Sequence, residues 1–256
     1  MDWLLAPIDA SRGHEVGFAI SWHARAMVLA WGVLAPLAVL MARFFKVMPG
    51  QDWPRELDNQ TWWRAHWMGQ ALVGCLSIFA LALVLPTDPA AMSLHNWLGF
   101  AVLASLVVQV LLGIFRGNKG GPTAPSADGS WRGDHYDMTP YRRMFEMFHK
   151  GLGYLTLALA AVTILLGLWK ANGPVWMWLS LLIWWTALIL AFVIFQRRGM
   201  AVDTYQAIWG DDPEHPGNQM LRPGWGMNRP GDINKGDEAY VRRDRGDGVR
   251  GHRTRI

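Results

Sequence analysis

Five apolar stretches, each long enough to cross a lipid bilayer as a helix, are the feature that most limits how this chain can fold. They cover residues 18–45, 63–86, 94–115, 145–169 and 175–196. A membrane-spanning helix needs about 20 mostly apolar residues. Residues that favour turns follow several of them, such as Pro49 and Gly50 after the first. We therefore expect an all-α membrane protein with five transmembrane helices, the first four forming an up-down-up-down bundle.

The composition agrees with a membrane protein and excludes several other classes. Hydrophobic residues make up 52% of the chain and charged residues only 17%. The single cysteine, Cys75, lies in an apolar stretch, so one chain can build neither a disulfide framework nor a cysteine-based metal site. The net charge is +4, but the basic residues flank apolar stretches, where anionic lipid headgroups attract them. We do not expect nucleic acid as a partner.

The chain divides into three parts. Residues 1–17 lack the basic region, apolar run and small-residue cleavage site of a signal peptide, so we expect an N-terminal outer segment. Residues 18–196 form the transmembrane domain. Residues 197–256 are rich in Gly, Pro, Asp and Arg, and we predict a mostly disordered basic tail.

The distribution of basic residues predicts the orientation in the membrane. Three Lys or Arg residues lie near helix ends on the N-terminal side, against twelve on the other side. The three are Arg12, Arg25 and Lys170; the twelve are Arg43, Lys46, Arg55, Arg64, Arg116, Lys119, Arg132, Arg142, Arg143, Lys150, Arg197 and Arg198. Because basic residues accumulate on the cytoplasmic side, we expect the N-terminus outside and the C-terminus in the cytoplasm of a bacterial inner membrane.

Four of the eight histidines lie within the first turns of four different apolar stretches: His23, His66, His95 and His149. Ligand-type residues inside a membrane span are costly, and their default interpretation is functional. Successive spans run in opposite directions, so His23 and His95 lie near the outer face, and His66 and His149 near the inner face. The histidines therefore form two pairs.

Each pair can face across the bundle, because the first and third helices of such a bundle are diagonal neighbours, as are the second and fourth. Two neutral imidazoles on opposite sides of a flat macrocycle are what bis-histidine haem iron requires. The pattern predicts two haem b groups, one near each membrane face. A lone histidine would be an ordinary interfacial residue. A copper or zinc site would need Met, Cys or carboxylate partners at the same depths, where Glu146 near His149 is the only acidic candidate and the outer pair has none.

Four sequence motifs resemble the cytochrome b561 family. They are SWHARAMVLAWGVLAPLAVLMARFFK at residues 21–46, WWRAHW at 62–67, LHNWLGF at 94–100 and FHKGLGY at 148–154. The resemblance runs from Trp22 to about Phe195 and is strongest to the five-span form that eukaryotes place behind a DOMON domain. We expect a bacterial-type, stand-alone version. The resemblance implies a transmembrane electron carrier with two b haems, and the family's four ligands match His23, His66, His95 and His149.

Haem propionates need cationic or hydrogen-bonding partners at the membrane surface. Lys150 and Arg64 are the leading candidates on the inner side because they adjoin ligands, and Asn96 is a candidate on the outer side. Contact with phospholipid is the simpler interpretation for any one of them. Glycines follow the ligands closely, and small residues there would admit a porphyrin edge or only close helix packing. They are Gly69, Gly99, Gly151 and Gly153.

The main functional hypothesis is transmembrane electron transfer, with the haems carrying the chemistry and the protein setting their position and potential. The reductant would be a small molecule such as ascorbate or quinol, or a redox partner protein. A second hypothesis is a membrane-anchor cytochrome b subunit that exchanges electrons between quinone and a partner. A third is a structural or transport protein without haem. A homodimer is possible from the sequence. The sequence also leaves open whether the chain is an enzyme, which would then be a transmembrane oxidoreductase.

Overall fold

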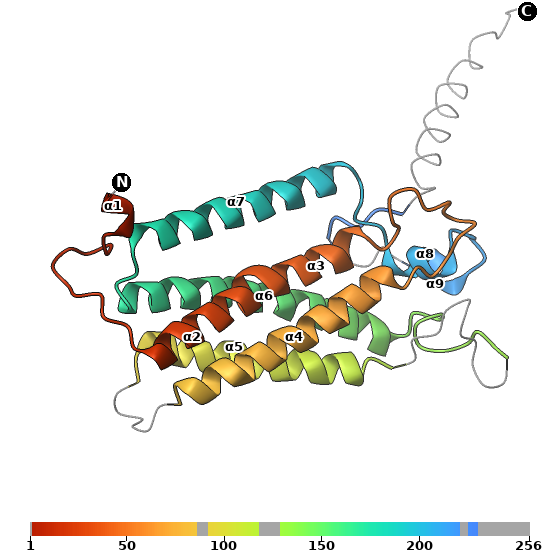
Figure 1. Cartoon of the computed structure of the whole chain (residues 1–256). Coiled ribbons are helices and arrows are strands. Elements are labelled where there is room, and N and C mark those ends of the chain that lie inside the picture. The colour runs from red at the N-terminus through yellow and green to blue at the C-terminus, as the bar shows by residue number, and fades with distance from the viewer. Residues whose placement is uncertain (1, 86–91, 118–128, 221–224, 230–256) are drawn as a thin grey trace, which may run out of the picture.

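The computed structural model describes residues 2–85, 92–117, 129–220 and 225–229. Over these residues the chain is helical, and five helices are long and apolar enough to cross a membrane. The predicted fold class is confirmed, while the packing of the first four helices as a closed bundle stays a prediction. In Figure 1 the long helices lie roughly parallel, and successive ones run in alternating directions.

The first membrane span is one long helix with a change of winding at its centre. It consists of α2 (Phe18–Met27), the π-helical η1 (Val28–Leu34) and α3 (Ala35–Phe44). Pro36 has no backbone N–H and so removes one internal hydrogen bond of the helix. The carbonyl four residues earlier, that of Gly32, instead accepts bonds from the indoles of Trp184 and Trp185, at 2.9 and 3.3 Å. A π-helical turn of this kind is often found at functional sites.

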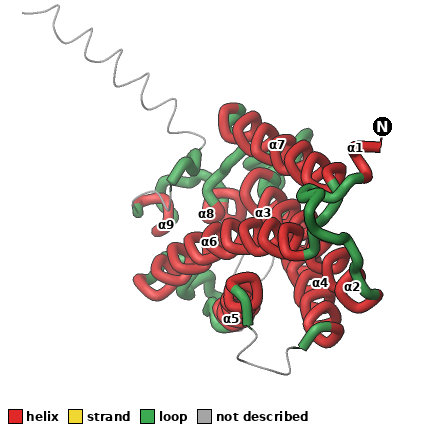
Figure 2. The backbone as a smooth tube through the Cα atoms, turned by 90° about the vertical axis from the view of Figure 1, so that its left-hand side faces the viewer, coloured by secondary structure: helices red, strands yellow, loops and turns green. Residues whose placement is uncertain are grey.

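The other four spans are α4 (Thr61–Leu83), α5 (Leu94–Ile114), α6 (Pro140–Lys170) and α7 (Val175–Arg197). Helix α6 begins five residues before the predicted stretch, at Pro140, and Thr139 caps it by accepting a bond from the N–H of Arg142. Helix α4 packs on the first span and α5 packs on α6. Figure 2 shows α7 on the far side of the molecule from α5.

A layer of buried apolar side chains lies near the middle of the helices. Its members are Ala30, Trp31, Ala35, Val73, Val102, Ala160, Ile164 and Leu181, all of them buried. Many larger apolar side chains on α5 and α7 are exposed instead, among them Val107, Ile114, Ile183 and Ile189. Side chains of that kind face lipid in a membrane-spanning protein.

The N-terminal segment is held against the turn between α6 and α7. A short helix α1 (Asp2–Leu5) precedes it, and Val175 donates its N–H to the carbonyl of Ala6 at 3.0 Å. Asn172, fully buried in this turn, donates its side-chain amide to the carbonyls of Asp9 and Arg12 at 3.0 and 2.7 Å. This clasp closes one end of the helical assembly.

Residues 199–220 and 225–229 form a folded C-terminal cap over the opposite end. The cap contains α8 (Thr204–Trp209), all of whose residues are buried, and α9 (Pro216–Gln219). An ion pair of 2.7 Å between Asp203 and Arg229 closes it internally. Part of the predicted disordered tail is therefore packed; the remainder lies outside the described residues, where the prediction of disorder is untested.

Candidate haem-binding sites

The structure brings the four intramembrane histidines together as two pairs. The ring centroids of His23 and His95 lie 6.2 Å apart, and those of His66 and His149 also lie 6.2 Å apart. We call the two regions the His23 end and the His66 end. A metal–imidazole bond of about 2 Å on each side, extended by the half-width of each ring, gives a centroid separation of about 6 Å. Both pairs thus have the spacing of two axial ligands on one metal.

Three of the four imidazoles are oriented by a backbone carbonyl of another helix. The Nδ1 atoms of His23, His66 and His95 lie 3.0, 3.1 and 2.9 Å from the carbonyls of Ala80, Ala38 and Thr163. A carbonyl can only accept, so these nitrogens carry the proton and each Nε2 keeps its lone pair for a metal. The carbonyl of Ala80 is available because α4 ends there, where Val84 donates instead to Leu81.

His149 is held differently. Its Nδ1 is buried and has no hydrogen-bond partner in the described part of the chain. Its ring stacks on Phe145, one turn earlier on α6, at 5.3 Å between centroids. Its backbone carbonyl accepts a bond from the amide of Gln109 at 2.9 Å. Packing and helix position, without a carbonyl partner, therefore fix this ligand.

Each pair borders a large cavity. The His23 cavity measures about 840 Å³ and the His66 cavity about 600 Å³. Cavities that bind small molecules or cofactors measure about 300–1,000 Å³. Among the described residues no group of three or more His, Cys, Asp or Glu side chains could hold a bare metal ion. Two histidines and an adjoining cavity fit a metal that brings its own equatorial ligands, as haem iron does.

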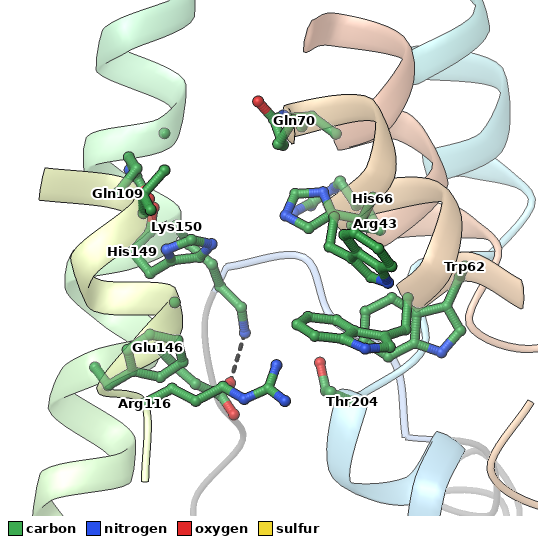
Figure 3. Close-up of a pocket in the computed structure, with 18 of the residues that line it drawn as sticks. Arg43, Trp62, His66, Gln70, Gln109, Arg116, Glu146, His149, Lys150 and Thr204 are labelled. Atoms are coloured by element: carbon green, nitrogen blue, oxygen red, sulfur yellow. Dashed lines mark hydrogen bonds and ion pairs between the residues drawn. The ribbon is translucent and has the colours of Figure 1, made fainter. Parts of the chain in front are cut away.

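Charged side chains line one side of the His66 cavity. Glu146, which is buried, pairs with Lys150 at 2.7 Å (Figure 3). It also pairs with Arg142 at 3.4 Å. Arg116 lies over the ring of Trp63 at 4.0 Å, and its guanidinium points toward Thr204 of the cap. Cationic side chains at this position can pair with the carboxylates of a bound cofactor.

A buried lysine also lines this cavity. The Lys46 ammonium donates to the carbonyl of Val202 in the C-terminal cap at 2.9 Å. Burial lowers the pKa of Lys46 to about 7, with a further reduction from the charge of Lys150. Lys46 thus joins the first membrane span to the cap with an ammonium that has no carboxylate within salt-bridge distance among the described residues.

The three residues predicted to contact haem propionates have different surroundings in the structure. Lys150 lines the His66 cavity, whereas Arg64 is exposed on α4 and is not among the described residues that line it. Asn96 lines the His23 cavity, but its side-chain oxygen accepts bonds from the N–H and hydroxyl of Ser93, at 3.1 and 2.6 Å, and so caps α5. Ligand status and propionate contacts remain predictions for all these residues.

Several residues of the sites carried no clear signal in the sequence. His135, which lies outside the five apolar stretches, is buried, lines the His66 cavity and accepts a bond from the Trp209 indole at 3.3 Å. Gly167 was not singled out, yet a Cβ atom there would lie 2.8 Å from Cε1 of His95. Among the glycines that follow the histidines in sequence, Gly99 and Gly153 line cavities, while Gly69 faces Ala38 in helix packing.

A scan against protein-family models matches residues 22–118 to the family described as eukaryotic cytochrome b561. Over these residues the chain is similar to the cytochrome b561 family. Searches of curated proteins and of solved structures found no match. The similarity suggests b-type haem and transmembrane electron transfer. The matched range contains His23, His66 and His95, whereas His149 lies beyond it, so the assignment of His149 depends on its place opposite His66.

Proposed function

We propose that this chain belongs to the cytochrome b561 family and passes electrons across a membrane through two b-type haems, one held by His23 and His95 and one by His66 and His149. The observation that carries the proposal is the equal centroid separation of 6.2 Å in both pairs. The protonated Nδ1 atoms of three imidazoles support it, because each leaves Nε2 unprotonated.

Haem supplies one-electron chemistry when bound, and the residues of the chain hold and insulate it. The four imidazoles would hold the haem iron through their Nε2 atoms. Lys150, Arg116 and Arg142 would neutralise propionates at the His66 end. The packed layer at mid-height excludes water between the two cavities.

The orientation belongs to the same proposal. The excess of Lys and Arg at the His66 end favours the cytoplasmic side for that end and the outer side for the His23 end, in a bacterial inner membrane.

Haem stoichiometry tests the proposal. The purified chain should contain two haems with low-spin b-type spectra. His23→Ala and His95→Ala should each remove one haem, and His66→Ala and His149→Ala should each remove the other. His14→Ala is the matched control, since His14 lines the His23 cavity but its Nδ1 contacts the carbonyl of Ala171 at 2.8 Å. A parent protein without haem would refute the proposal. Loss of both haems in every histidine variant would refute two separate pairs.

One observation favours a lipid-soluble electron donor or acceptor, as in the quinone-linked hypothesis. Three side chains that line the His66 cavity are also exposed toward lipid: Trp67, Val110 and Ile114, at 49%, 49% and 67%. These apolar side chains on α4 and α5 would let a lipid-soluble molecule approach the cavity from the membrane, while the C-terminal cap lies over its aqueous end. Reduction in proteoliposomes by a quinol, but slowly by ascorbate added at the His66 end, would support this entrance. The reverse preference would favour ascorbate.

A further inference from the structure

The mid-height layer between the two cavities contains one residue that touches both. Among the described residues, Trp31 alone lines the His23 cavity and the His66 cavity. It lies in η1, at the centre of the first membrane span between α2 and α3 (Figure 1). Its side chain is 6% exposed, and the buried layer around it includes Ala30, Ala35 and Ala160.

The Trp31 indole has a fixed orientation. Its Nε1 donates to the hydroxyl of Ser77 on α4 at 3.0 Å, and that hydroxyl donates to the carbonyl of Val73 at 2.7 Å. A buried indole N–H needs such a partner, so the bond selects one side-chain conformation. The π-helical winding around Trp31 shifts side chains relative to a regular helix, and thereby sets the direction in which the indole projects.

An electron that moves between two separated cofactors tunnels through the intervening atoms, and it tunnels faster through a dense, bonded path than across a void. A large aromatic ring fills more of that path than any aliphatic side chain. Because Trp31 alone among the described residues borders both cavities, its indole offers a continuous path from one to the other.

We propose that Trp31 is the bridging residue for electron transfer between the two haems, with Ser77 as its positioning residue. One haem loses an electron and the other gains it, and the indole is neither oxidised nor reduced. This inference depends on the proposed two-haem function. It adds which part of the chain sets the rate between the two sites.

The test compares Trp31→Leu, Trp31→Met and Trp31→Phe with the parent protein. Haem content and both midpoint potentials are measured first, and then the rate at which an electron injected at one haem by a light flash equilibrates with the other. We expect two haems and unchanged potentials. The rate should fall at least tenfold in the Leu and Met variants and two- to threefold in the Phe variant. Ser77→Ala should give a smaller decrease.

Trp185→Leu is the matched control. Trp185 packs on the same layer and donates to the carbonyl of Gly32 at 3.3 Å, but it lines neither cavity. The Trp185→Leu variant loses the same indole volume, and its rate of electron equilibration between the haems should not change. An unchanged rate in any Trp31 variant that keeps both haems, or an equal decrease in the Trp185 variant, would overturn the bridging role. A parent protein with fewer than two haems would instead refute the proposed function.

Discussion

The His23 end and the His66 end hold histidine pairs at the same separation, yet the chain closes them by different means. A short N-terminal segment clasped by Asn172 covers the His23 end. The C-terminal cap covers the His66 end. Every buried charged side chain in the described part of the chain lies at the His66 end or in its cap: Arg43, Lys46, Arg142, Glu146, Asp203 and Arg229.

This difference indicates a division of roles. Buried charges are costly unless they are paired and hydrogen-bonded, so a chain keeps them where they hold a structure or interact with a ligand. The His23 end depends instead on close packing and backbone hydrogen bonds around its ligands. We therefore expect the His23 end to respond most to changes of side-chain volume and the His66 end to changes of charge.

The largest expected effect concerns volume at the His23 end. A Cβ atom on Gly167 would lie 2.8 Å from Cε1 and 3.1 Å from Nδ1 of His95, so Gly167→Ala should displace this imidazole. The haem-to-protein ratio should fall from two to about one, with the haem at the His66 end retained. Gly151→Ala is the control, since nothing lies within 4 Å of its added Cβ, and it should keep both haems. Two haems in Gly167→Ala would show that the His23 end tolerates volume.

The next effect concerns charge at the His66 end. Arg229→Met leaves Asp203 buried without its ion-pair partner, which costs about 3–5 kcal/mol. The cap should become sensitive to protease and the free energy of unfolding should fall, whereas Asp203→Asn combined with Arg229→Met should recover part of the loss. Both are measured by limited proteolysis and SDS titration.

The control for this charge effect is an exposed ion pair. Arg55→Met breaks the ion pair with Asp52. The side chains of Arg55 and Asp52 are 86% and 61% exposed, so the free energy of unfolding should fall by only about 0–1 kcal/mol. Equal losses in Arg229→Met and Arg55→Met would contradict the view that the cap depends on its buried pair.

The helices and the histidine pairs could be predicted from sequence because both follow from local rules. Apolar length identifies a span, and the alternating direction of spans assigns each histidine to one face. Those rules placed His23 with His95 and His66 with His149 before any packing was known. The structure has the same two pairs.

The C-terminal cap could not be predicted, because its order depends on contacts far apart in the chain. Tyr205 donates to the carbonyl of Tyr136 at 2.9 Å, and the indole of Trp53 donates to the carbonyl of Gln206 at 3.2 Å. Composition alone makes this Gly- and Pro-rich segment look unable to pack. Gly167 and Trp31 were missed for a similar reason, since one glycine or one tryptophan among many acquires meaning only from its neighbours across helices.

The smallest expected effect is a pH dependence specific to the His66 end. Burial lowers the pKa of Lys46 from 10.5 to about 7 in the folded protein, while the unfolded chain keeps the ordinary value. Between pH 7 and 10.5 the unfolded state therefore binds a proton that the folded state does not. The free energy of unfolding should rise with pH across this window, by at most about 1.4 kcal/mol per pH unit. Below pH 7 Lys46 is protonated in both states and adds no pH dependence.

Substitutions of Lys46 test this pH dependence directly. Lys46→Met cannot be charged and Lys46→Arg cannot lose its charge, so both should remove this part of the slope, the Arg variant being the less stable at high pH. SDS titration of the parent and the two variants between pH 6 and 9.5 measures it as a difference, in which the other titrating groups cancel. Parallel curves for all three proteins would mean that Lys46 keeps its proton in the folded state. The charge of Lys46 would then be balanced within the His66 end, which would weaken the contrast with the His23 end.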